Sequence, residues 1–180
     1  MDFTEINTNR LTLRVITPAA YSDIFDNCDD KTIMNILGIS SADEVEKERE
    51  KYAKGITTYN RSFLHFYVVM PDTEKVIGWC GYHIWYTDHN RAEIGYKIFE
   101  NKYKRKGYMT EVLAAALHYG FEEMNLYRIE AMAAPENEPS LKLLENFGFS
   151  KEGYLREHYL ADGVMTDSVL YSLLRNELKS

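Results

Sequence analysis

Cysteine is scarce in this sequence, which has only Cys28 and Cys80 among its 180 residues. Two cysteines at this spacing match no metal-binding motif. They are typical of a protein from a reducing compartment, although a single disulfide between them remains an alternative. We therefore expect a cytoplasmic protein without a metal site.

Long apolar runs are also missing. No stretch approaches the roughly 20 apolar residues that a membrane-spanning helix needs, and the opening MDFTEINTNR has neither the basic start nor the apolar segment of a secretory signal. We see no repeat, low-complexity tract or linker, so we expect one domain over residues 1–180. We also expect no membrane partner. The formal charge of −7 argues against binding to nucleic acid and favours cationic partners.

Within this acidic chain, the segment KYKRKGYMTEVLAAALHYGF (residues 102–121) places four cations and a glycine before an apolar helical run: Lys102, Lys104, Arg105, Lys106 and Gly107. A helix N-terminus carries partial positive charge and unpaired N–H groups, so each exposed cation there costs about 0.3–1 kcal/mol. The same features suit a bound phosphate. The segment therefore indicates an anion-binding loop, with a solvated basic loop as the alternative.

Hydrophobic periodicity predicts the order of the secondary structure. Strands are expected over residues 11–15, 62–70, 76–85, 92–99, 128–133, 149–160 and 165–174. Helices are expected over residues 19–27, from the capping box at 41–44 to about 59, over 109–124, and over 140–146. This order predicts an α/β (mixed α+β) fold whose central, mostly antiparallel, twisted sheet of about seven strands has helices on both faces.

Three segments resemble motifs of the GNAT family of N-acetyltransferases, and within it the branch that contains the ribosomal-protein N-terminal acetyltransferases. They are RAEIGY at 91–96, KRKGYMTE at 104–111, and NEPS at 137–140 followed by ENFGF at 145–149. The opening TNRLTLR at 8–14 extends the resemblance over nearly the whole chain. The resemblance implies the GNAT fold, acetyl-CoA as co-substrate, and direct acetyl transfer to a primary amine in a ternary complex.

The resemblance also implies how acetyl-CoA binds. Its pyrophosphate would contact the basic loop and helix start: Lys104, Arg105, Lys106, Gly107, Tyr108, Met109 and Thr110. The family pattern there is Gln/Arg-x-x-Gly-x-Gly/Ala, so Lys104 and Met109 depart from it. Met109 either crowds the pyrophosphate or points into the core. Ile98 and Phe99 would bind the pantetheine arm through their backbone.

Glu93 is the candidate general base. It lies within a predicted strand between Ala92 and Ile94, so its side chain faces the opposite side from theirs. A partly buried carboxylate there would accept the proton of the amine through a water molecule. The alternatives are a structural or amine-binding carboxylate, or a histidine base from the set His65, His83, His118 and His158.

The resemblance places two further residues near the thioester. Asn137 would contact pantetheine, and the Ser140 hydroxyl would donate a hydrogen bond to the departing sulfur; for both, the alternative is capping of the next helix. The family's tyrosine acid is replaced by Leu144, so that role does not carry over. Cys80 is interpreted as a buried residue and not as a nucleophile.

The expected acceptor is the α-amine of a basic protein, such as a ribosomal protein. An α-amine of pKa near 7.8 is about 14% neutral at pH 7, whereas a lysine is about 0.04% neutral. A small amine, such as a polyamine or an antibiotic, is the alternative acceptor. A catalytically silent CoA-binding module is the alternative function. We expect a monomer or a homodimer.

Overall fold

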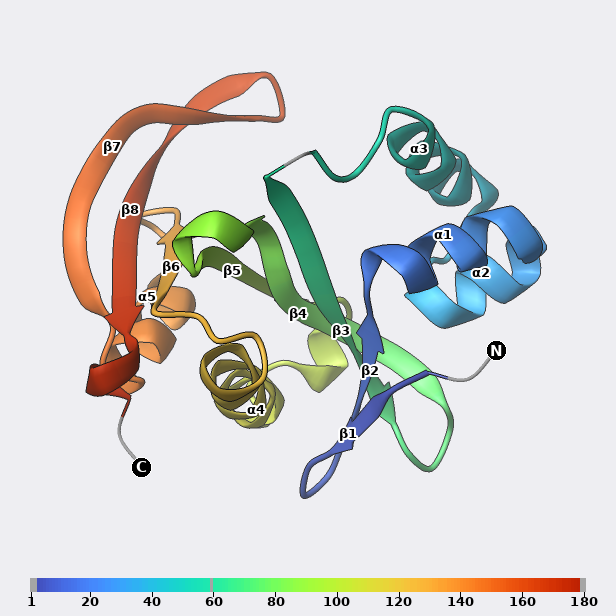
Figure 1. Ribbon diagram of the computed structural model, residues 1–180, viewed down its shortest axis with the longest axis horizontal. Helices are drawn as coiled ribbons and strands as arrows, with labels where there is room; N and C mark the ends of the chain where they lie inside the picture. Colours follow the sequence, from blue (N-terminus) through green and yellow to red (C-terminus); the bar gives the residue numbers. More distant parts are fainter. Residues whose placement is uncertain (1–2, 59, 179–180) are drawn as a thin grey trace.

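The computed structural model describes residues 3–58 and 60–178, in which eight strands form one sheet of order β1-β2-β3-β4-β5-β6-β8-β7 (Figure 1). The strands are β1 (Glu5–Asn7), β2 (Thr12–Ile16), β3 (Arg61–Met70), β4 (Lys75–Tyr86), β5 (Arg91–Ile98), β6 (Arg128–Ala133), β7 (Ser150–Ala161) and β8 (Val164–Leu174). All neighbours are antiparallel except β5 and β6, which are parallel. The predicted mixed, mostly antiparallel sheet is confirmed.

Helices cover both faces of this sheet, as predicted. They are α1 (Pro18–Asn27), α2 (Asp30–Leu37), α3 (Ala42–Ala53), α4 (Tyr108–Glu122) and α5 (Glu138–Asn146). Alternation along β2 divides the core, because Val15 packs with residues of α4 whereas Ile16 packs with residues of α1 and α2. Figure 1 shows α1, α2 and α3 together on the opposite side of β2 and β3 from α4.

Local signals explain most helix starts. The Thr17 hydroxyl accepts a hydrogen bond from the Ala20 N–H, and Pro18 occupies the first turn of α1. At α3, Ser41 caps the Glu44 N–H as predicted, but the Glu44 carboxylate accepts from the Ser40 N–H instead of that of Ser41.

Some predicted boundaries are wrong. The helix α3 ends at Ala53, because Gly55 with φ +84° follows. Residues 54–58 were predicted to be helical and are not. Residue 59, the predicted end of the helix, lies outside the described residues. The helix α5 begins at Glu138, two residues early, since Pro139 fits its first turn. Neither β1 nor α2 was predicted.

The strands β5 and β6 pair over only three residues and then part. The paired residues are Arg91 with Arg128, Ala92 with Ile129, and Glu93 with Glu130. Over the rest of their length, residues 94–98 and 131–133 have no partner in each other's strand within the described chain. We call the opening between these segments the wedge. The carboxyl ends of both strands lead into helices, so the N-termini of α4 and α5 lie at the open end of the wedge, where α/β proteins commonly bind ligands.

Candidate active site

The start of α4 has the free donors that an anion requires. Gly107 is the N-cap, with φ +77°, and the described residues provide no side-chain cap. The first backbone bond of the helix runs from the Glu111 N–H to the Gly107 carbonyl. The N–H groups of Tyr108, Met109 and Thr110 therefore have no partner within residues 3–58 and 60–178. This arrangement, with Gly107 allowing close approach to the backbone, suits a phosphate group.

The cations of the loop differ in availability. Lys102 forms an ion pair with Glu100 at 2.8 Å, and Lys75 shares the same carboxylate at 2.6 Å, so Lys102 is already paired. Lys104, Arg105 and Lys106 are exposed and form no ion pair with any described residue. Met109 packs against the main core, which favours the second of its two predicted roles and leaves the loop uncrowded.

Arg10 is a further cation at this loop that the sequence did not identify. Its guanidinium lies 4.7 Å from the centre of the Tyr108 ring, and its Nη1 donates to the Lys106 carbonyl at 3.0 Å. Glu111 holds it through an ion pair of 2.8 Å. Burial raises the pKa of Glu111, but hydrogen bonds from Thr8 and Arg10 outweigh it and lower the pKa overall. The carboxylate therefore stays charged and fixes Arg10 beside Gly107.

Backbone direction alternates along β5. The Phe99 N–H donates to the Ile77 carbonyl of β4 at 2.9 Å. Successive backbone groups of a strand point to opposite edges, so the N–H and carbonyl of Ile98 and Tyr96 face the wedge. Ile98 is therefore placed to bind an extended arm through its backbone, whereas the N–H of Phe99 is committed to β4.

The start of α5 closes the other side of the wedge. Asn137 caps α5, since its Oδ1 accepts from the Ser140 N–H at 3.3 Å. The Ser140 side chain does not cap the helix; its hydroxyl is hydrogen-bonded to the Tyr96 hydroxyl at 2.7 Å. Thus the capping alternative holds for Asn137 and fails for Ser140. Leu144 is fully buried.

Glu93 lies at the point where the wedge closes. Its side chain is 8% exposed, and its Oε1 is 3.0 Å from His83 Nε2. A bulge in β4 between Tyr82 and Ile84 puts His83 in this position. Burial raises the pKa of Tyr159 on β7, and the nearby Glu93 carboxylate raises it further. Glu93, His83 and Tyr159 thus form one polar cluster.

The other candidate nucleophiles and bases are inert or distant. Burial, together with the nearby His83, lowers the pKa of His65 to about 4, so this ring is neutral. His118 is exposed on α4, and His158 on β7 is bonded to Ser168. Cys80 is fully buried, and burial raises the pKa of its thiol well above the usual range. Among the four histidines, His83 is the one paired with Glu93.

A model of the acetyltransferase (GNAT) domain matches residues 10–150. The chain belongs to the GNAT acetyltransferases. It is 34% identical over 175 residues to an uncharacterized N-acetyltransferase, p20, of Bacillus licheniformis, covering 94% of this chain and 96% of that one. It is also 34% identical over 113 residues to the [ribosomal protein uS5]-alanine N-acetyltransferase of Escherichia coli, covering 62% of this chain and 58% of that enzyme.

Solved structures agree with this GNAT assignment. A GNAT-family acetyltransferase from Bacillus anthracis superimposes with a TM-score of 0.66 at 28% identity, covering 97% of this chain and 100% of that one. A spermidine N-acetyltransferase from Vibrio cholerae superimposes with a TM-score of 0.67 at 25% identity, covering 92% and 96%. The protein is therefore an acetyl-CoA-dependent N-acetyltransferase, as predicted.

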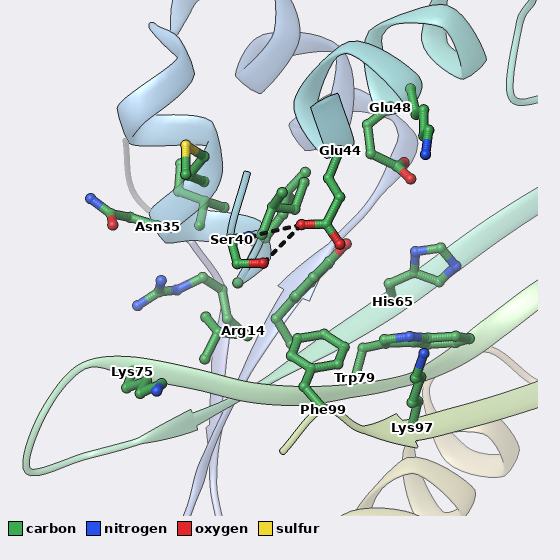
Figure 2. Close-up of a pocket in the computed structure, with 18 of the residues that line it drawn as sticks. Arg14, Asn35, Ser40, Glu44, Glu48, His65, Lys75, Trp79, Lys97 and Phe99 are labelled. Atoms are coloured by element: carbon green, nitrogen blue, oxygen red, sulfur yellow. Dashed lines mark hydrogen bonds between the residues drawn. The ribbon is translucent and has the colours of Figure 1, made fainter. Parts of the chain in front are cut away.

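A groove of about 1470 Å³ crosses the face of the GNAT sheet that carries α2 and α3 (Figure 2). Glu44 and Glu48 of α3 line one wall, and His65 of β3, Trp79 of β4 and Phe99, which directly follows β5, line the other. Figure 2 shows the His65 and Trp79 rings beside each other, and their centres are 5.5 Å apart. The groove thus has an aromatic floor beneath a charged helix.

Trp79, which lines the groove, lies near the His83–Glu93 pair. A Cβ on Gly95 would lie 3.0 Å from an atom of the His83 ring and 3.2 Å from Trp79. Trp79 and His83 therefore both lie over Gly95, and His83 in turn is hydrogen-bonded to Glu93. Within residues 3–58 and 60–178, no three or more His, Cys, Asp or Glu side chains lie together in a way that could hold a metal ion. None of the helices described is long and apolar enough to span a membrane.

Proposed function

We propose that this enzyme acetylates the α-amine of a protein or peptide N-terminus by direct transfer. The observation that carries the proposal is the buried Glu93 carboxylate, hydrogen-bonded to His83 where the wedge closes. Ala92 and Ile94 pack on the α4 side of the sheet, so Glu93 faces the opposite side. A base in that position receives a proton from an amine that approaches from the face opposite the pyrophosphate loop.

In this proposal each part of the site has one task. Lys104, Arg105, Lys106 and the N-terminus of α4 hold the pyrophosphate, and the β5 backbone at Tyr96 and Ile98 holds the pantetheine arm. Asn137 keeps its side-chain amide available for the same arm while its oxygen caps α5. Glu93 takes the proton of the amine and shares it with His83, whose side chain is 34% exposed and can return it to water.

The dimensions of the groove support a peptide acceptor. Its volume of about 1470 Å³ exceeds the roughly 300–1,000 Å³ typical of small-molecule pockets, and its lining includes residues of α2, α3, β3 and β4. The lining charges are nearly balanced, with five carboxylates and six cations: Glu44, Glu48, Glu50, Glu74, Glu100, Arg14, Lys47, Lys51, Lys54, Lys75 and Lys97. Shape and hydrogen bonding therefore support recognition better than net charge does.

Two other functions remain candidates. The likeness to a spermidine N-acetyltransferase supports a small-amine acceptor, and the same wedge would serve it. A silent CoA-binding module would keep the loop but would not need a buried base. Direct transfer is favoured over an acetyl-cysteine intermediate because Cys80 is inaccessible.

An acceptor comparison tests the proposal. We expect a lysine-free peptide with a free N-terminus to be acetylated at least 10-fold faster, in kcat/KM, than its N-blocked twin carrying one lysine. The physical reason is that the neutral fraction at pH 7 is a few hundredfold higher for the α-amine. Release of CoA thiol measures both rates, with spermidine as a third acceptor.

Each outcome of this comparison has a clear meaning. Faster reaction of the blocked lysine peptide would refute the α-amine assignment. Preference for spermidine would establish the small-amine alternative. Thiol release with none of the three acceptors, despite bound acetyl-CoA, would favour the silent module.

A further inference from the structure

A hydrogen bond of 2.7 Å between the hydroxyl groups of Tyr96 and Ser140 crosses the wedge. Tyr96 belongs to β5, whereas Ser140 lies in the first turn of α5, 44 residues later. The Ser140 backbone N–H is already bonded to Asn137, so helix capping does not explain the position of its side chain. The bond joins the two sides of the wedge where the proposed function puts the thioester.

The direction of this hydrogen bond decides what Ser140 can do. A serine hydroxyl has one proton, so if Ser140 donated to Tyr96 it would have none left for another acceptor. A phenol is more acidic than an alcohol and is therefore the better donor of the two. Burial raises the pKa of Tyr96 to about 12, outweighing a lowering by the hydrogen bond with Ser140. Tyr96 thus keeps its proton at any pH at which the amine reacts.

We propose that Tyr96 is a positioning residue whose hydroxyl donates to Ser140 Oγ and so directs the Ser140 proton toward the thioester sulfur. This inference rests on the proposed site of transfer. The resemblance to the family implies a tyrosine acid at the position that Leu144 occupies in this chain. Leu144 cannot act as an acid, and its side chain is buried in the core. The Tyr96–Ser140 pair brings a phenol to the wedge from β5 and a hydroxyl from the first turn of α5, the helix that also carries Leu144.

The chemistry balances without a further reactant. The amine nitrogen forms a bond to the thioester carbonyl carbon, and the carbon–sulfur bond breaks. The sulfur keeps the electron pair of that bond and leaves as a thiolate, which accepts a hydrogen bond from Ser140. Both hydroxyl protons stay on their oxygens, and the thiolate later takes a proton from water. The proton lost by the amine leaves through Glu93 and His83. Fixed donors aimed at developing negative charge lower the barrier, and one such donor is typically worth about 10²–10³-fold in kcat.

The proposal can be tested without any acceptor, by titrating the thiol of CoA bound to the protein. The ultraviolet absorbance of the thiolate is measured, and the titration of the desulfo-CoA complex is subtracted to remove the tyrosine signal. We expect Tyr96→Phe and Ser140→Ala each to raise the pKa of the bound thiol by about one unit, equivalent to about a tenfold change in the ionisation constant.

Rates provide the second measurement. We expect Tyr96→Phe to lower kcat about tenfold, less than a direct donor would, with little change in KM for acetyl-CoA. Because Tyr96 acts through Ser140, the double variant should lose no more than Ser140→Ala alone. The control is Tyr82→Phe, which removes a fully buried hydroxyl bonded to the Ala116 carbonyl at 2.8 Å and should leave the thiol pKa unchanged.

Three results would overturn the proposal. An unchanged thiol pKa in Tyr96→Phe would do so whatever the rate, as would additive losses in the double variant. Loss of CoA binding in Tyr96→Phe would assign the residue to holding the cofactor instead. The thiol titration and the CoA-binding measurement use no amine, so a failed choice of acceptor under the proposed function cannot produce the first or the third of these results.

Discussion

Replacing Lys104, Arg105 and Lys106 together with alanine is expected to weaken CoA binding by on the order of 100-fold at low ionic strength. Hydrogen bonds between a cation and a phosphate are worth roughly 1.5–3 kcal/mol each, and solvent screening reduces this for exposed side chains such as these. The loss should shrink as salt is added, because exposed charges are screened over about 10 Å at 0.1 M. Calorimetric titration with CoA at two salt concentrations measures both effects.

A matched variant separates the loop from net charge. Lys31, Lys142 and Lys151 are exposed lysines on α2, α5 and β7, and replacing them with alanine removes the same three charges. This control should bind CoA nearly as the wild type does, and both variants should unfold at similar temperatures. Equal CoA affinity of the two triple variants would show that the basic cluster is only a solvated loop.

The sequence predicts those parts of the fold that local chemistry determines. Helix α1 follows from a Thr-Pro start, and the β7–β8 hairpin from Asp162-Gly163, whose φ values of +49° and +80° are those of a tight turn. The short strand β1 was missed because its three residues depend on pairing with β2. Helix α2 has local signals at both ends, an Asp29 N-cap and Gly38, which adopts the left-handed conformation there.

The candidate site depends even more on contacts that local sequence patterns do not predict. The position of Glu93 follows from strand alternation, but its pairing with His83 depends on a bulge in β4 that shifts the register. Arg10 lies beside the loop because it forms an ion pair with Glu111, which is 101 residues away in the sequence. The Tyr96–Ser140 bond arises only because β5 and β6 part after three pairs. Such contacts depend on tertiary structure and leave no local pattern.

Glu93→Gln is expected to lower kcat/KM for an α-amine acceptor by about 100-fold or more at pH 7. General bases typically contribute roughly 10²–10⁴-fold, and glutamine keeps the shape of the side chain without accepting the proton. The loss should narrow at higher pH, because the neutral fraction of an amine of pKa near 7.8 rises about sevenfold between pH 7 and pH 9. Initial rates measured across this range, at saturating acetyl-CoA, test the expectation.

Glu130→Gln is the matched control for this variant. Glu130 is the β6 partner of Glu93 in the parallel ladder, but its carboxylate is bound by Arg91 and Arg128, each at 2.8 Å. Its replacement should lower stability more than rate, because it removes charge from an ion-pair network and leaves the proposed base in place. A Glu93→Gln enzyme with near wild-type rates at pH 7 would show that this carboxylate is structural. A large loss that stays constant from pH 7 to pH 9 would indicate instead that Glu93 binds the acceptor.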